Sequence, residues 1–69
     1  MKRERLINAR VERHLSQREV ARTVGVSRAA YVRYETGLRT PTLDVALNIA
    51  SALESTVDAL FGTEVPQRK

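Results

Sequence analysis

The sequence contains no cysteine and only one histidine, His14, in its 69 residues. A disulfide cannot form, and a single histidine without thiols lacks the set of ligands that protein metal sites use. No apolar run is long enough to span a membrane, and the basic N-terminus leads into alternating polar residues rather than into an apolar signal segment. The sequence therefore predicts a soluble cytoplasmic protein with no metal and no other cofactor.

A strand pattern is missing as well. Strict alternation of apolar and polar residues never persists, whereas apolar residues recur at spacings of three and four along the chain. Internal repeats and low-complexity segments are absent, and 69 residues leave room for a single core. We expect an all-α fold in one domain over residues 1–69, with an ordered core over about 3–62 and a flexible tail over 63–69.

Capping residues divide the chain into five predicted helices. Ser16 and Glu19 form a capping box for a helix that ends before Gly25. Ser27 caps the next helix, which runs to about Glu35. The other three helices are expected over residues 3–14, from Pro41 or Thr42 (with Thr40 or Thr42 as the cap) to about Leu53, and from Thr56 to Phe61.

Each long helix carries a face that is expected to pack in the core. In the first helix this face comprises Leu6, Ile7, Arg10, Val11 and His14. In the second it comprises Val20, Ala21 and Val24, and in the third Ala30, Tyr31 and Tyr34. In the fourth it comprises Leu43, Ala46, Leu47, Ala50 and Leu53.

Positive charge is concentrated in the first part of the chain. Residues 1–39 hold ten Lys and Arg against four Glu, a net charge of +6. Residues 40–67 hold four acids and no base, a net charge of −4, and Arg68 and Lys69 add +2. One end of the molecule should therefore present a basic surface, which is typical of a protein that binds a polyanion.

The third predicted helix has an outer face with two arginines and small side chains. Its members are Arg28, Ala29, Val32, Arg33 and Thr36. An α-helix fits the major groove of DNA, where Arg pairs with guanine and small apolar groups contact the thymine methyl. An ordinary solvated face is the alternative interpretation of the same pattern.

The second predicted helix strengthens the nucleic-acid interpretation. Its N-terminus, at Ser16 and Gln17, should offer free backbone N–H groups and the positive end of the helix dipole, which suit a phosphate. Two helices joined by a short turn at Gly25 form a helix-turn-helix, in which the second helix enters the groove and the first crosses the backbone.

The chain closely resembles the lambda-repressor-like helix-turn-helix family, of the Cro/cI or XRE type, over about residues 3–62. The matching residues are Leu15-Ser16-Gln17, Val20-Ala21, Val24-Gly25-Val26-Ser27, Tyr34-Glu35-x-Gly37, Pro41 and Ser55-Thr56-Val57-Asp58-Ala59-Leu60-Phe61. The resemblance implies a five-helix domain that binds operator DNA, usually as a two-fold dimer. It implies base reading by Arg28, Ala29, Val32 and Arg33, although many members carry an amide or polar residue at the positions of Ala29 and Val32. Contacts to the DNA backbone are expected from Ser16, Gln17, Arg18, Ser27, Thr36, Arg39 and Thr40.

Two charged residues are expected to pair inside the domain. Arg10 lies within the apolar stripe of the first helix, where an uncompensated charge is costly. Glu35 lies at the edge of the buried side of the third helix, as its last residue. We predict a partly buried Arg10–Glu35 ion pair, which the family resemblance supports; a contact between Arg10 and a phosphate is the alternative.

The last helix carries a candidate dimer interface. A chain this short gains from oligomerisation, and the acidic C-terminal part is unsuited to face DNA. Val57, Leu60 and Phe61 are therefore interface candidates, and packing of all three within the single chain is the alternative.

Nothing in the sequence favours catalysis, since no serine has a histidine or carboxylate arranged to activate it. We expect a transcriptional repressor, not an enzyme, that binds double-stranded operator DNA as a homodimer. The alternative is an adaptor or antitoxin that uses the same fold to bind a partner protein. RNA binding is disfavoured because exposed aromatic side chains for base stacking are lacking.

Overall fold

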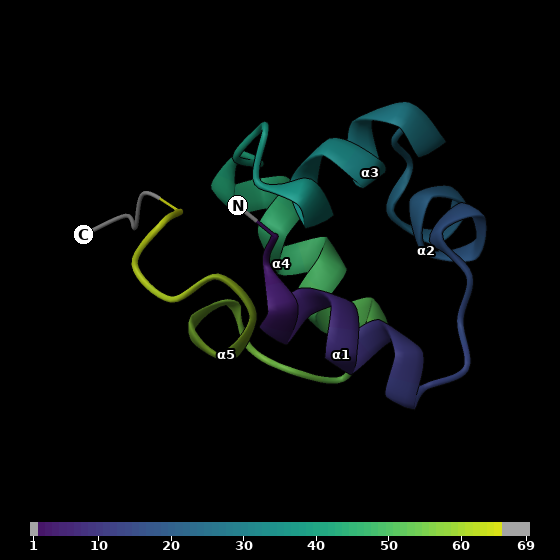
Figure 1. Cartoon of the computed structure of the whole chain (residues 1–69), viewed down its shortest axis with the longest axis horizontal. Coiled ribbons are helices and arrows are strands. Elements are labelled where there is room, and N and C mark those ends of the chain that lie inside the picture. Colours follow the sequence, from purple (N-terminus) through teal and green to yellow (C-terminus); the bar gives the residue numbers. More distant parts are fainter. Residues whose placement is uncertain (1, 66–69) are drawn as a thin grey trace.

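Five α-helices form among residues 2–65, which are the residues that the computed structural model describes (Figure 1). They are α1 (Glu4–Glu12), α2 (Gln17–Val24), α3 (Arg28–Thr36), α4 (Leu43–Ala52) and α5 (Val57–Phe61). This part of the chain contains no β-strand. The prediction of an all-α, five-helix domain is confirmed.

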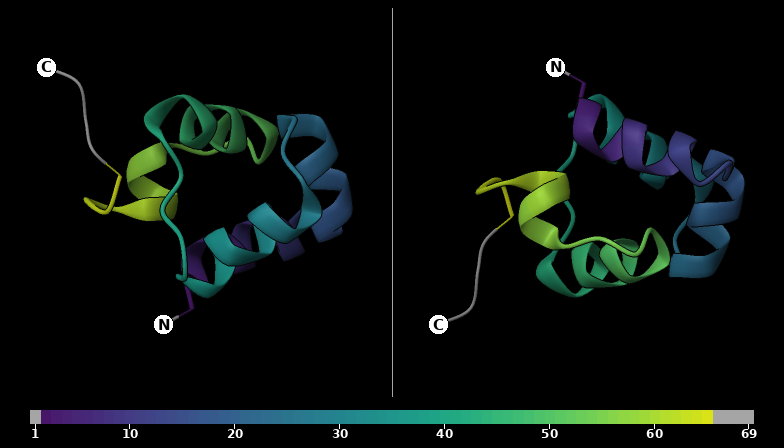
Figure 2. Two further views of the ribbon diagram at one scale, coloured as in Figure 1. Left: turned by 90° about the horizontal axis from the view of Figure 1, so that it is seen from above. Right: turned by 90° about the horizontal axis from the view of Figure 1, so that it is seen from below.

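The helices surround one core. Seen from above and below, α4 lies along one side, α1 and α3 lie along the other, and α2 and α5 occupy opposite ends (Figure 2). The α2 helix packs against α3 and α4, and α5 packs against α1 and α4. This arrangement leaves α3 at the edge of the domain with one side turned away from the core.

Four helices begin at a hydroxyl cap, as the sequence predicts. The caps are Ser16, Ser27, Thr42 and Thr56. Thr42 rather than Thr40 caps α4, since its side chain accepts a hydrogen bond from the backbone N–H of Val45 (3.4 Å). Each such cap contributes about 1 kcal/mol to stability because it satisfies a backbone N–H that has no partner within the helix.

The end of α1 differs from the prediction. The helix stops at Glu12, and His14 adopts a left-handed conformation (φ 59°) with an exposed side chain. The N–H groups of His14 and Leu15 donate to the carbonyls of Val11 and Arg10 (2.9 and 3.3 Å), which is a Schellman turn. The sequence predicts that His14 and Val11 pack in the core. In the structure neither does, and Val11 is 54% exposed.

The buried face of α4 is also rotated from the predicted one. Leu47 is 51% exposed, whereas Ile49 is fully buried with Ala46, Ala50 and Leu53. At about 100° per residue, Leu47 lies about 100° from Ala46, whereas Ile49 lies only about 60° away on the other side. The core therefore covers the side of the helix that carries Ile49.

The C-terminal part of the described chain packs inside the domain. Val57, Leu60 and Phe61 are only 7%, 3% and 3% exposed. The structure therefore shows the alternative arrangement, in which all three residues pack within the single chain. Val65 is 1% exposed, so this residue of the expected tail over 63–69 packs inside the domain. Residues 66–69 of the predicted tail lie outside the described residues.

Substitutions on the two sides of α4 should separate in their effects. Ile49→Ala is expected to lower the free energy of unfolding by about 2–5 kcal/mol, because it leaves a cavity in the core. Leu47→Ala, the matched control on the exposed side, is expected to change it by about 0.5 kcal/mol or less. Urea unfolding measures both. If Ile49→Ala does not fold, Ile49→Val should cost about 0.5–1.5 kcal/mol. Equal losses at positions 47 and 49 would contradict the observed rotation of α4.

Candidate nucleic-acid interface

A tight turn joins α2 to α3. Gly25 adopts a left-handed conformation (φ 89°) that side-chain-bearing residues rarely adopt. The N–H groups of Gly25 and Val26 both donate to the carbonyl of Ala21 (2.8 and 3.0 Å), and this closes the end of α2. Ser27 immediately caps α3. Only residues 25–27 separate the two helices, as a helix-turn-helix requires.

The inner side of α3 is fixed by its two tyrosines. Tyr31 is fully buried and Tyr34 is 7% exposed. Their rings meet edge to face, with centroids 6.4 Å apart and planes at 87°. Because both rings are buried in the core, the opposite side of α3 faces outward.

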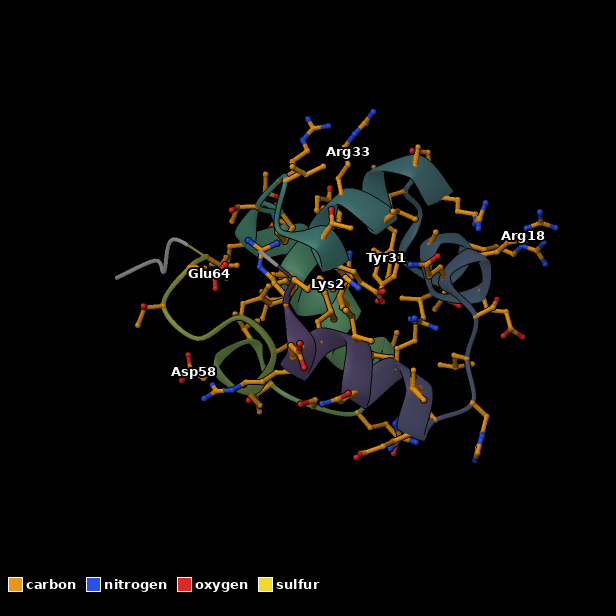
Figure 3. The ribbon with its side chains drawn as sticks, viewed as in Figure 1. Lys2, Arg18, Tyr31, Arg33, Asp58 and Glu64 are labelled. Carbon is orange, nitrogen blue, oxygen red and sulfur yellow. The ribbon has the colours of Figure 1, made fainter. Side chains whose placement is uncertain are left out.

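The outer side of α3 carries the residues that the family resemblance assigns to base reading. Arg28, Ala29 and Arg33 are exposed, and Val32 is half-buried. Arg33 projects from α3 away from the body of the domain (Figure 3). The structure thus brings all four residues to one side of one helix, and no bulky side chain among them prevents close approach to a groove.

A surface hollow of about 480 Å³ lies at the N-terminus of α2. Its lining residues are Arg10, Ser16, Gln17, Arg18 and Arg28. Within residues 2–65, no acceptor bonds the backbone N–H groups of Gln17 and Arg18. The N–H of Ser16 is not among the free groups, because it donates to Glu19 Oε1 (2.8 Å) in the capping box that the sequence predicts. Two free N–H groups and the guanidinium groups of Arg18 and Arg28 make this hollow suited to a phosphate.

Ion pairs sort the arginines into two groups. Arg3, Arg10 and Arg13 are paired with carboxylates, the nearest N–O distances being 2.7, 2.6 and 2.7 Å. In the described part of the chain, six arginines form no ion pair, and five of them lie on α2, on α3 or in the loop after α3; the six are Arg5 of α1, Arg18, Arg22, Arg28, Arg33 and Arg39. In Figure 3, Arg18 and Arg33 project outward from α2 and α3, whereas Asp58 lies at the opposite end of the domain. The unpaired positive charge is therefore concentrated on the helix-turn-helix.

The expected ion pair ties α1 to α3. Arg10 Nε donates to Glu35 Oε2 (2.6 Å) and Arg10 Nη2 donates to Glu35 Oε1 (3.2 Å). Arg10 Nη1 donates to the carbonyl of Leu15 (2.8 Å), so all three guanidinium nitrogens have partners within the domain. The side chain of Glu35 is only 2% exposed, and its hydrogen bonds raise the pKa of the Arg10 guanidinium. Arg10 is thus engaged by Glu35 rather than free for a phosphate.

Gln17 joins the same network from α2. Its Nε2 donates to Glu35 Oε1 (3.0 Å), which places one amide N–H on the carboxylate and leaves the second for another acceptor. Gln17 also lines the hollow at the start of α2. Its side chain therefore links the buried ion pair to the candidate phosphate site.

Tyr31 lies beside this network. Its ring is fully buried, and its hydroxyl forms no hydrogen bond with any group among residues 2–65. Burial raises the pKa of the Tyr31 phenol well above its ordinary value, and the neighbouring Glu35 carboxylate raises it further. The folded domain therefore disfavours the phenolate.

The end of α3 and the loop after it carry the other residues expected at the DNA backbone. Thr36 Oγ1 and the backbone N–H of Arg39 both donate to the carbonyl of Arg33 (3.2 Å each). Thr40 is exposed, and its Oγ1 accepts a hydrogen bond from Arg3 Nη2 (3.0 Å). Sequence analysis missed this role of Arg3, because in a basic N-terminal segment it is indistinguishable from its neighbour Arg5.

The geometry agrees with a family match. The chain matches the helix-turn-helix family over residues 6–60. The chain belongs to this family. It is a helix-turn-helix of the XRE, or Cro/cI, type, a family of DNA-binding transcription regulators, as the resemblance implied.

Similar proteins of this helix-turn-helix family are described as transcriptional regulators. The chain is 39% identical over 59 residues to the cryptic phage CTXphi transcriptional repressor RstR of Vibrio cholerae serotype O1, a match that covers 86% of this chain and 53% of that protein. It is 34% and 31% identical over 61 residues to the uncharacterized HTH-type transcriptional regulator YqaE and the HTH-type transcriptional regulator AnsR, both of Bacillus subtilis. Each of these two matches covers 88% of this chain and 53% of the relative. The chain spans about half the length of the curated relatives it matches. No helix within residues 2–65 is long and apolar enough to cross a membrane.

Breaking the buried ion pair should destabilise the domain strongly. Glu35→Gln is expected to lower the free energy of unfolding by about 3–5 kcal/mol, because it leaves the Arg10 charge without its counter-charge. The matched control is Glu54→Gln at the exposed Arg13–Glu54 pair, where the expected loss is about 1 kcal/mol or less. The double variant Arg10→Met/Glu35→Leu should lose less free energy of unfolding than the sum of the losses in Arg10→Met alone and Glu35→Leu alone. Urea unfolding measures the cycle, and additive losses would contradict coupling between the two residues.

Stability should fall at alkaline pH because of Tyr31. The phenol is neutral in the folded and unfolded chains below about pH 10, so its contribution is fully present there. Above that pH the unfolded chain loses the proton while the folded chain keeps it, and the free energy of unfolding falls by up to about 1.4 kcal/mol per pH unit. Urea unfolding from about pH 8 to about pH 11 should show a shallower fall in Tyr31→Phe than in the wild type. Parallel profiles would contradict the raised pKa of Tyr31.

Proposed function

We propose that this helix-turn-helix domain binds double-stranded operator DNA with α3 in the major groove and represses transcription. The observation that carries the proposal is the outer side of α3, where Arg28 and Arg33 are exposed and have no ion-pair partner among residues 2–65. Guanidinium groups so placed can donate two hydrogen bonds to guanine O6 and N7. Ala29 and Val32, between them, suit contact with a thymine methyl.

The second element of the proposal is the phosphate contact beside α3. The hollow at the start of α2 includes Arg28, so a phosphate bound there lies next to the base-reading side of α3. The free N–H groups of Gln17 and Arg18 and the second amide N–H of Gln17 are the donors. The hydroxyls of Ser16 and Ser27 accept from their own helices and can still donate to a phosphate oxygen.

The loop after α3 supplies backbone contacts on the other side. Thr36 is the last residue of α3 and Arg39 and Thr40 follow it, and the guanidinium of Arg39 has no carboxylate partner within the described residues. Contacts before and after α3 set its register in the groove, whereas contacts to base edges determine the sequence that it binds.

Repression and pairing of two copies complete the proposal. The relative RstR is described as a transcriptional repressor. Two copies on a pseudo-palindrome would place their α3 helices about 34–36 Å apart, one turn of the duplex. Val57, Leu60 and Phe61 are buried within one chain and are not available as the contact between copies.

Selection of bound duplexes from a random pool is the direct test. The expected result is a pseudo-palindromic site whose half-sites contain guanine and lie about one helical turn apart. A single unpaired half-site would contradict the dimer. Absence of duplex binding at low salt would contradict DNA binding altogether.

Substitutions on the selected duplex should separate base reading from backbone contact. Arg28→Ala or Arg33→Ala is expected to cost about 1–3 kcal/mol and to relax the preference at particular base pairs. Arg39→Ala should weaken binding to all sequences alike and reduce the slope of log K against log salt by about 1. Arg5→Ala in α1 is the control, and affinity should change less than twofold. A loss of specificity in Arg39→Ala, or none in the two α3 variants, would contradict the assigned roles.

A further inference from the structure

Arg3 is a buried arginine at the start of α1. The whole residue is 7% exposed, and its backbone N–H donates to the carbonyl of Glu35 (2.8 Å). Its Nη1 donates to the carbonyls of Tyr34 and Arg39, the latter at 2.8 Å, and its Nη2 donates to Thr40 Oγ1 (3.0 Å). One side chain therefore joins the N-terminus, the end of α3 and the loop that follows it.

The other side of the same guanidinium faces the C-terminal segment. Arg3 Nε donates to Glu64 Oε1 (2.7 Å), and the guanidinium carbon lies 5.5 Å from the centroid of the Phe61 ring. The side chain of Arg3 is 5% exposed, whereas that of Glu64 is 57% exposed. The carboxylate thus compensates the buried charge, and the aromatic ring packs against its face.

Arg3 contributes to the shape of the loop over residues 37–42. The side chains of Leu38, Arg39 and Thr40 are exposed and contribute little packing, whereas Pro41 is buried and anchors only the end of the loop next to α4. Its backbone is fixed to α3 by the bond from the Arg39 N–H to the carbonyl of Arg33 at 3.2 Å. Arg3 adds two further bonds, one to the backbone and one to a side chain of the loop. The fork of a guanidinium can make these bonds together, and the ammonium group of a lysine cannot reproduce their geometry.

We propose that Arg3 is a positioning residue for DNA binding, which holds the loop over residues 37–42 in the conformation that brings Arg39 and Thr40 to the phosphate backbone. The inference rests on the proposed function. Arg3 does not itself contact DNA, because its guanidinium is buried and its donors are directed at groups of the domain. It acts through the loop.

The variant that tests this role is Arg3→Lys, with Arg13→Lys as its matched control. Arg13 has the same kinds of partner, since its Nε donates to the carbonyl of Leu53 (2.8 Å) and its Nη2 to Glu54 (2.7 Å), but these lie at the end of α4. Binding to the duplex selected by the wild-type protein is measured over a range of salt concentrations, under conditions where circular dichroism shows every variant folded. Arg3→Lys should lower affinity roughly tenfold and reduce the slope of log K against log salt by about 1, because one phosphate contact is lost. Arg13→Lys should change affinity less than twofold.

Two further measurements separate positioning from a general loss of stability. In an Arg39→Ala/Thr40→Val background, Arg3→Lys should lower affinity no further, because the groups through which it acts are gone. In the free protein, hydrogen exchange of the Arg39 amide should rise about tenfold in Arg3→Lys and stay unchanged in Arg13→Lys. If Arg3→Lys does not fold, Glu64→Gln replaces it, with Glu54→Gln as the control.

The outcomes distinguish the two proposals. Faster exchange at Arg39 together with a non-additive loss of affinity supports the positioning role. Unchanged exchange, unchanged affinity, or an equal loss in the Arg39→Ala/Thr40→Val background overturns it while leaving DNA binding intact. If the wild-type protein binds no duplex, the proposed function is overturned, and the proposed role of Arg3 in DNA binding is overturned as well.

Discussion

The structure depends on one carboxylate buried where three helices meet. Glu35, near the end of α3, receives hydrogen bonds from Arg10 of α1 and from Gln17 of α2. A buried charge is tolerated only when its partners are close and well directed, so these bonds can form only if the three helices keep one relative arrangement. The angle at which α3 projects from the domain, and hence everything its outer side can reach, follows from satisfying that carboxylate.

Arginines in this chain have different roles that their environment decides. Arg3, Arg10 and Arg13 each bind a carboxylate and at least one backbone carbonyl, so they act as internal connectors. The guanidinium group suits this use because it offers five donors in a plane and stays charged when buried. The arginines of α2 and α3 have no such partners in the described residues and keep their charge for an external one. The net charge of the basic half therefore overstates the charge available to DNA.

Local chemistry made much of the fold predictable. The hydroxyl caps satisfy free backbone N–H groups, the glycine at position 25 takes a left-handed conformation, and the Arg10–Glu35 pair compensates a buried charge. Each of these needs arises within a short segment or a single pair of residues. Ile49 and Leu47 were not distinguishable, because a helix of ten residues presents two overlapping apolar faces and the packing of the whole domain selects one. His14 was not expected in a left-handed turn because glycine usually takes that position. Arg3 was missed because its partners lie 31 to 61 residues away in the chain, and no local pattern carries such a contact. The base-reading assignment came from the family resemblance and from the helical periodicity of α3, and the operator that it selects depends on a partner molecule.

The Arg3–Glu64 contact joins the two ends of the described chain across 61 residues. In most small domains the ends fray first, and fraying there leaves the working surface undisturbed. In this domain the residue that would leave with the N-terminus is the one that bonds the loop after α3, and the residue that would leave with the C-terminal segment is the one that neutralises it. Fraying at either end of the described residues would therefore also weaken the bonds that hold the loop over residues 37–42, which links both of these ends thermodynamically to the surface that we propose binds DNA.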